Sequence, residues 1–258
     1  MKKESVTVII TVWKRDYLEE QLQSLVNQSH RPEAIWIIQN ENHITIQPVI
    51  DKFRRVFPDI FVIHSDFNFK FFGRFSLCSH AASEYILVID DDVIPSCGWL
   101  SICTQKCGEY DSIISCTGRL IPPGSFRPEE WKEDEMKKYC IGDNFNEDDS
   151  NYVPQDTWVD YGCNSYFFRT AWIRHFWEAW PYTFLSGEDI HLSASLMTLR
   201  SIPTLVPQQI SGDTSGNLKK YYSQDDLSSW RKPGFIDIRE SIFEHFIKER
   251  NWKPILWK

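Results

Sequence analysis

Residues 85–95 of the chain read YILVIDDDVIP, an apolar run that ends in three consecutive carboxylates. The first five residues predict a β-strand that is buried on both faces, because no polar residue interrupts them. Pro95 lacks the backbone N–H that pairing requires, so it prevents the strand from continuing. Since α/β sheets bind ligands at the ends of such strands, we expect Asp90, Asp91 and Asp92 to line a binding site.

The acidic triplet poses an electrostatic problem if it is buried. Continued strand geometry would point Asp90 and Asp92 to one side of the sheet and Asp91 to the other. Like charges this close repel each other, so a buried triplet needs a positive partner. Hard oxygen ligands suit Mn²⁺ or Mg²⁺, whose sites typically combine one or two carboxylates with substrate phosphates. A solvated acidic turn is the alternative, and the position after a buried strand favours the metal.

Size and composition restrict the class of protein. The chain has 258 residues, enough for one large α/β domain or two small ones, and 42% of them are hydrophobic. Aromatic residues make up 15%, which suits sugar stacking, although packing explains most aromatic side chains. The net charge of −8 disfavours a nucleic acid polymer as partner.

The chain carries no visible targeting or membrane signal. Residues 1–4 lead directly into a strand without a signal-peptide core, and no apolar run approaches the ~20 residues of a membrane span. The seven cysteines are scattered without a Cys-x-x-Cys pair and are interpreted as reduced thiols. We therefore expect a cytoplasmic protein, with peripheral association at the inner face of a membrane as an open possibility.

Strands alternate with helices in the first half of the chain, which predicts βαβ units and a largely parallel sheet. Asp16 is expected to cap the first helix, with Glu19 as its capping-box partner. No Gly-x-Gly-x-x-Gly and no Walker motif follow the first strand, which disfavours a classical dinucleotide or P-loop site. The predicted strands are residues 6–11, 34–39, 60–64 and 85–89, and the predicted helices start near 16 and cover 48–56 and 75–82.

The second half is less regular. Residues 120–154 are rich in Pro, Asp, Glu and Asn and are predicted to be an irregular segment. A helix starting at Gly187-Glu188-Asp189 is predicted after it. The other predictions are helices over 99–107, 171–180 and 236–250, and strands over 112–117, 158–168 with a break at Gly162, and 204–206.

Four motifs, in this order, resemble the GT-A class of nucleotide-sugar glycosyltransferases. The first motif is residues 11–15 at the end of the first strand, and the second is residues 39–41 at the end of the second strand. The third is Arg74 followed by the acidic triplet, which corresponds to the "DXD"-type motif. The fourth is residues 187–189 at the start of a later helix. The resemblance covers about residues 5–210. The general pattern is similar to that of family-2-type enzymes, and some features are similar to the exostosin-like family. It implies a single GT-A domain with a mostly parallel central sheet flanked by helices and a C-terminal helical extension.

The resemblance also implies a division of labour along the chain. Residues 1–118 would bind the nucleotide, residues 119–210 the acceptor, and residues 211–258 would form a C-terminal loop and helix. Asp92 would bind Mn²⁺ or Mg²⁺, which neutralises the leaving diphosphate. The implied nucleotide-binding residues are Thr11, Val12, Arg15, Asn40, Arg74, Asp90 and Asp91. Solvated loop charges, and a turn-forming role for Asn40, are the alternatives.

On the acceptor side, Asp189 is the implied catalytic base and Glu188 would orient the acceptor. The alternative is that both acids only favour the helix N-terminus electrostatically. Trp158, Asp160 and Tyr161 are the implied acceptor-binding residues, although aromatic residues are more often part of a core. Lys219, Lys220 and Arg231 would contact the diphosphate, with a solvated basic patch as the alternative.

The expected function is metal-dependent transfer of a sugar from a nucleoside-diphosphate sugar, expected to be a UDP-sugar, to a hydroxyl of a glycan or glycolipid. Inversion with Asp189 as base is preferred, and a retaining exostosin-like reaction stays open. A nucleotidyltransferase would normally show a glycine-rich loop, which residues 11–15 lack. A non-catalytic nucleotide- or sugar-binding module is the third alternative.

Overall fold

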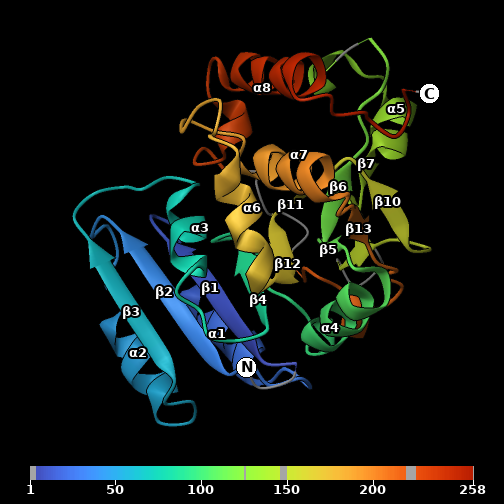
Figure 1. Cartoon of the computed structure of the whole chain (residues 1–258). Coiled ribbons are helices and arrows are strands. Elements are labelled where there is room, and N and C mark those ends of the chain that lie inside the picture. The colour runs from blue at the N-terminus through green and yellow to red at the C-terminus, as the bar shows by residue number, and fades with distance from the viewer. Residues whose placement is uncertain (1–3, 125, 146–149, 219–224, 258) are drawn as a thin grey trace.

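The computed structural model describes residues 4–124, 126–145, 150–218 and 225–257. Within these ranges one large sheet has the strand order β10-β13-β5-β12-β4-β1-β2-β3 (Figure 1). Its strands are β1 (Val6–Val12), β2 (Ala34–Asn40), β3 (Ile60–Ser65), β4 (Tyr85–Ile89), β5 (Ile113–Ile114), β10 (Thr157–Val159), β12 (Ser165–Arg169) and β13 (Thr204–Val206).

The sheet is mostly parallel, as the alternating pattern predicts. β1 pairs in parallel with β2 and β4, β2 with β3, and β5 with β13. β12 is antiparallel to both β4 and β5, and β10 is antiparallel to β13. The carboxyl ends of β1, β2 and β4 therefore lie at one edge of the sheet.

Helices cover both faces of the sheet. α1 (Leu18–Val26), α2 (Gln47–Arg54) and α4 (Trp99–Tyr110) contribute to one apolar core. α3 (Gly73–Cys78), α6 (Ile173–Glu178) and α7 (Glu188–Arg200) contribute to the core on the other face. Leu87 and Ile89 of β4 point into the first core, and Ile86 and Val88 into the second. The prediction that this strand is buried on both faces is confirmed.

A C-terminal helix, α8 (Phe235–Glu249), lies across α7 (Figure 1). Ile242, Phe243 and Phe246 of α8 share a third apolar cluster with Ile190 and Ala194 of α7. Since Arg74 contacts both Glu188, the first residue of α7, and Asp90, directly after β4, α8 is brought close to the carboxyl end of β4. The predicted helical C-terminal extension is thus present.

The segment between β5 and β12 folds differently from its prediction. The strand expected over 112–117 and the strand with a break at Gly162 expected over 158–168 are both wrong. Each stretch is divided between two sheets, and Gly162 is itself paired within a strand. β11 (Tyr161–Cys163), β6 (Thr117–Arg119) and β7 (Cys140–Ile141) form a separate three-stranded sheet. Asn164, at φ 68°, separates β11 from β12 with a left-handed residue that a continuous strand cannot contain.

Two further predictions are corrected. Residues 120–154 are not wholly irregular, since they include η1 (Pro128–Glu130), α5 (Glu133–Tyr139), β7 and the pair β8 (Asn144–Phe145) and β9 (Asn151–Tyr152). The capping box of Asp16 and Glu19 is wrong, because α1 begins at Leu18 and its N-cap residue, Tyr17, makes no side-chain capping bond.

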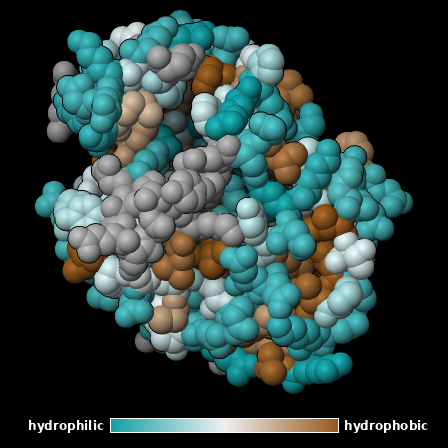
Figure 2. All heavy atoms as spheres, turned by 180° about the vertical axis from the view of Figure 1, so that it is seen from behind, coloured by the Kyte–Doolittle hydropathy of each residue, from teal (hydrophilic) through white to brown (hydrophobic). Residues whose placement is uncertain are grey.

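The helices and the visible surface are the parts of the described structure that bear on membrane spanning. None of the helices in the described ranges combines the length and apolar character needed to cross a bilayer. Seen from behind, the surface is mainly hydrophilic and its apolar groups lie in separate patches (Figure 2).

Candidate active site

Arg74 connects the acidic end of β4 to the start of α7. Its Nη1 donates a hydrogen bond to Asp90 Oδ1, and its Nη2 donates to Glu188 Oε1 at 2.9 Å. The Arg74 and Glu188 side chains are both buried, so their contact lies in a region of low dielectric where charge-assisted bonds are strong, whereas the Asp90 side chain is partly exposed. One guanidinium therefore joins two acidic motifs, one 16 residues and the other 114 residues beyond Arg74 along the chain.

Arg15, in the loop after β1, faces the rest of the triplet. Its Nη1 donates to Asp91 Oδ1 at 2.5 Å and lies 3.6 Å from Asp92 Oδ2. Its Nε and Nη2 each donate to the Asp225 carboxylate at 2.7 Å. Burial lowers the pKa of Arg15, but hydrogen bonding to Asp225 and the charges of Asp91 and Asp92 outweigh it, so the pKa is raised.

The predicted orientation of the triplet is wrong. β4 ends at Ile89 and the three acids lie in a turn, so the alternation of a strand does not extend to them. Asp90 faces Arg74, whereas Asp91 and Asp92 both face Arg15. Two arginines thus supply part of the positive charge that a buried acidic triplet requires.

Glu188 and Asp189 open α7 as predicted and are both buried. Gly187 precedes them at φ 83°, and a Cβ there would lie 2.3 Å from Ile242 Cδ1 of α8, so this position requires glycine. Burial, and then the charge of Asp189, raise the pKa of Glu188 above its ordinary value despite the neighbouring Arg74.

Asp189 forms a bidentate ion pair that sequence reasoning missed. Arg239 Nη1 and Nη2, from α8, donate to Asp189 Oδ1 and Oδ2, both at 2.9 Å. Asp189 Oδ1 also accepts the backbone N–H of Ile190 at 2.8 Å. The partner of the proposed base therefore comes from a helix outside the four motifs.

The nucleotide-side residues gather near the ends of β1 and β2. Thr11 Oγ1 is buried and has no hydrogen-bond partner among the described residues, and Val12 is buried beside it. Asn40 Oδ1 accepts the backbone N–H of Phe69 at 3.2 Å, which anchors the loop before α3. These three residues lie at the strand ends where the sequence predicts the base to bind.

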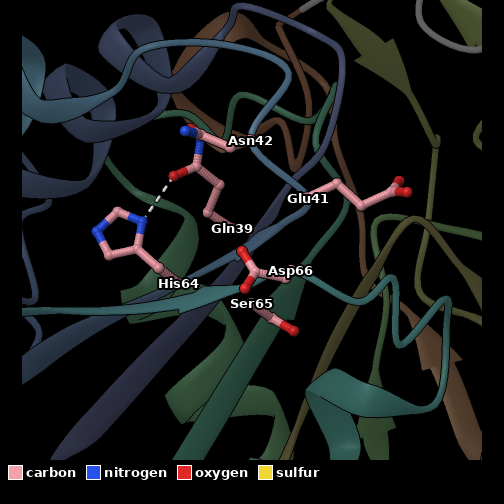
Figure 3. A pocket seen from close by; sticks show the side chains of 6 residues that line it. All are labelled: Gln39, Glu41, Asn42, His64, Ser65 and Asp66. Atoms are coloured by element: carbon pink, nitrogen blue, oxygen red, sulfur yellow. Dashed lines mark hydrogen bonds between the residues drawn. The ribbon is translucent and has the colours of Figure 1, made fainter.

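A polar cavity of about 140 Å³ lies beside them at the ends of β2 and β3 (Figure 3). His64 Nδ1 and Gln39 Oε1 share a hydrogen bond of 2.8 Å in its wall. Glu41 extends away from this pair and accepts a 2.6 Å bond from Trp13 Nε1. Its lining is formed by Gln39, Glu41, Asn42, His64, Ser65 and Asp66.

The predicted acceptor residues are divided between two places. Tyr161 is buried, and its ring centre lies 5.3 Å from the Arg239 guanidinium. Asp160 accepts the backbone N–H groups of Ile121 at 2.6 Å and of Ile255 at 2.7 Å, and burial raises its pKa to about 6. Trp158 and Asp160 line a second cavity, of about 290 Å³, which also includes Trp252. Only Tyr161 of the three lies next to the partner of Asp189.

The predicted diphosphate residues lie in the C-terminal segment. Lys219 and Lys220 fall outside the described residues. Arg231 is exposed and lies in η4 (Ser229–Arg231), 3.9 Å from Asp226, with its guanidinium 5.1 Å from the ring centre of Trp230. Asp225 and Ser228, which the sequence did not indicate, are the residues of this segment that accept hydrogen bonds from Arg15.

The chain was compared with known proteins. The profile of glycosyl transferase family 2 matches residues 7–176. A search of curated proteins gave no match. The match ends before Glu188, Asp189 and Arg239, so it carries no information on them.

Two crystal structures of Staphylococcus aureus TarS match the chain. TarS 1-349 gives a TM-score of 0.51 at 15% identity, covering 79% of this chain and 60% of TarS 1-349. The second TarS structure gives a TM-score of 0.49 at 16% identity, covering 80% of this chain and 37% of that one. The chain thus spans about 60% of the length of the first structure.

At this identity the likeness to TarS 1-349 shows the fold alone, and it confirms the predicted α/β fold of GT-A type. The comparisons give no support to the features that seemed similar to the exostosin-like family. The family profile matches well over half of the sequence, including β1 to β4 and the acidic triplet. The chain therefore belongs to glycosyl transferase family 2.

Proposed function

We propose that this chain transfers a sugar from a UDP-sugar to a hydroxyl group of a glycan or glycolipid acceptor, with inversion at the sugar carbon. The observation that carries the proposal is the contact of Arg74 with both Asp90 and Glu188. It joins the acidic strand end, expected to bind the donor, to the acids at the start of α7, expected to meet the acceptor. A transferase needs these two sites next to each other.

On the donor side, the diphosphate would lie against Arg15 and the turn of Asp91 and Asp92. Thr11, Asn40 and the adjacent polar cavity would receive the nucleobase, since amide, hydroxyl and imidazole groups can match its hydrogen-bonding edge. Asp90 would accept a hydrogen bond from a ribose hydroxyl. Arg74 Nε is a buried donor without a partner among the described residues and remains available to the nucleotide.

The residues of the turn fit a divalent cation that binds together with the diphosphate. No group of three or more His, Cys, Asp or Glu side chains in the described ranges is arranged to hold a metal by itself. Mg²⁺ sites, however, typically use one or two carboxylates and complete their shell with phosphate oxygens and water. Asp92, buried at the end of β4, would be the ligand, and bound Mn²⁺ or Mg²⁺ would neutralise the leaving diphosphate.

On the acceptor side, Asp189 would act as the general base. The acceptor oxygen forms a bond to the sugar carbon while the bond from that carbon to the diphosphate oxygen breaks. The proton of the acceptor hydroxyl passes to the Asp189 carboxylate, and the electron pair of the broken bond leaves with the diphosphate. Glu188, fixed by Arg74, would orient the acceptor, and Tyr161 lies within reach of the same region. Cytoplasmic location and peripheral membrane association stay predictions.

Asp189→Asn tests the proposal, because it keeps the shape of the side chain and removes its basicity. The donor is first found by screening UDP-glucose, UDP-galactose and UDP-N-acetylglucosamine for hydrolysis with Mn²⁺. We expect turnover to fall by ~10²–10⁴-fold, as for loss of a general base, while the affinity for UDP stays within a few-fold. Asp51→Asn, the same change on the remote α2, is the control. Near-normal turnover of Asp189→Asn would refute Asp189 as the base.

A further inference from the structure

We propose that Arg239 of α8 is a positioning residue for the transfer, which orients the Asp189 carboxylate for proton abstraction. This inference rests on the proposed function and deepens it. It assigns to α8, which lies beyond the family match, a part in the reaction.

The geometry of the pair is that of an orienting clamp. A guanidinium presents two parallel N–H groups to the two oxygens of a carboxylate, which fixes the carboxylate plane as well as its position. Both bonds measure 2.9 Å, and the Arg239 and Asp189 side chains are 13% and 9% exposed. Solvent therefore screens the pair little.

Arg239 is itself held in place by aromatic rings. Its guanidinium lies 5.3 Å from the ring centre of Tyr161 and 5.4 Å from that of Phe235. Cation–π contacts at this distance restrict the guanidinium and so restrict the carboxylate attached to it. The Tyr161 ring is thus connected to the proposed base through Arg239.

The hydrogen bonds leave the two carboxylate oxygens in different states. Asp189 Oδ1 accepts from Arg239 Nη1 and from the backbone of Ile190. Among the described contacts, Oδ2 accepts only from Arg239 Nη2, so it keeps more capacity for a new hydrogen bond. We assign Oδ2 as the oxygen that receives the acceptor hydroxyl.

Stability alone is a weak reason for this ion pair. Apolar side chains already hold α8 on α7, and replacing a buried ion pair by apolar residues is often neutral or stabilising. Arg74, by contrast, is paired with Glu188 and Asp90 and not with Asp189. The two arginines therefore serve different carboxylates, with Arg239 on the proposed base.

A double-mutant cycle separates positioning from structure. Steady-state kinetics with the UDP-sugar found in the screen are measured for Arg239→Lys, Arg239→Met, Asp189→Asn and the double variant Arg239→Met/Asp189→Asn. A misplaced catalytic group costs ~10²-fold, so we expect kcat of Arg239→Met to fall by about that factor with KM for the donor changed less than a few-fold. Arg239→Lys, which keeps the charge, should recover about a tenth or more of the lost rate. In the Asp189→Asn background, Arg239→Met should cause no further loss.

Controls keep the result interpretable if the single variant folds poorly. The double variant removes both buried charges and is expected to melt near the temperature of the wild type. Arg127→Met removes another arginine that contacts α8, through Asp237 and Glu240, and should leave kcat unchanged. Thermal melts give the folded fraction of each preparation.

Three results would overturn the inference. The first is an equal fold loss from Arg239→Met with and without Asp189, which would mean that Arg239 acts independently of the base. The second is a loss of rate fully explained by a smaller folded fraction, and the third is a large rise in KM for the donor. Near-normal turnover of Asp189→Asn would instead refute Asp189 as the base of the proposed function, whatever the effect of Arg239→Met, so the two failures are distinguishable.

Discussion

Replacing Asp225 by Asn should tighten the binding of UDP. The Asp225 carboxylate accepts from Arg15 Nε and Nη2 at 2.7 Å each, and these are donors that a diphosphate would also use. If Arg15 binds the diphosphate as proposed, Asp225 would compete with the nucleotide for it. An asparagine keeps the size of the side chain but loses the charge that makes it a strong competitor.

The magnitude follows from the electrostatics of the pair. Hydrogen bonding from Arg15 is the main cause that lowers the pKa of Asp225 from 3.8 to about 2. A lowering of that size corresponds to about 2.5 kcal/mol at most. Because the Asp225 side chain is 41% exposed, solvent screening reduces the usable part to about 1 kcal/mol. We therefore expect about a five-fold lower Kd for UDP.

Isothermal titration calorimetry of UDP in the presence of Mn²⁺ measures this change. The control is Asp226→Asn, which removes the same charge from the adjacent, fully exposed side chain. Equal tightening in both variants would indicate a general effect of net charge. Unchanged or weaker binding in Asp225→Asn alone would refute competition for Arg15 and would indicate that Asp225 supports the nucleotide site.

Three other changes test the metal, a buried histidine and the start of α7. Asp92→Ala should remove the Mn²⁺ dependence of UDP binding with the fold intact, and calorimetry giving the wild-type response to Mn²⁺ would contradict this. Burial lowers the pKa of His191 to about 4, so the unfolded chain binds its proton first. The contribution of neutral His191 to the free energy of unfolding is therefore present above pH ~6.5 and is lost as the pH falls towards 4, by up to ~3 kcal/mol. The melting temperature of His191→Leu should accordingly depend less on pH than that of the wild type. Gly187→Ala should destabilise the fold by ~1–3 kcal/mol, through strain at positive φ and the clash with Ile242. Gly124→Ala, at φ 101° with open space around it, adds strain alone and should cost less in the same denaturation assay.

The central part of the fold was predictable because its signals are local and long. β4 is an uninterrupted apolar run, and both-face burial follows from its pattern alone. β5, β6 and β11 contain two or three residues each, which is too short for any periodicity to show. Their division between two sheets depends on pairings with distant strands, which a local pattern does not encode.

The candidate site shows the same limit. The sequence motifs indicate which residues come together in the site, because each motif follows a recognisable strand or lies in a helix. They include Arg15, Arg74, the acidic triplet after β4 and the acids that open α7. Arg239 lies 50 residues beyond Asp189, on a helix with several other charged side chains. Asp225 lies 210 residues beyond Arg15. No spacing rule links such pairs, so only the folded structure could identify them.

The charge of the assembled site restricts how a donor can enter. Among the described residues, the carboxylates outnumber the guanidinium groups that pair with them. The carboxylates belong to Asp90, Asp91, Asp92, Glu188, Asp189 and Asp225, and the guanidinium groups to Arg15, Arg74 and Arg239. A diphosphate brings further negative charge and would enter against this excess. A divalent cation at Asp92 and displacement of Asp225 from Arg15 both reduce it. The metal dependence and the Asp225 effect should therefore be coupled, with Asp225→Asn lowering the Mn²⁺ concentration needed for half-maximal UDP binding.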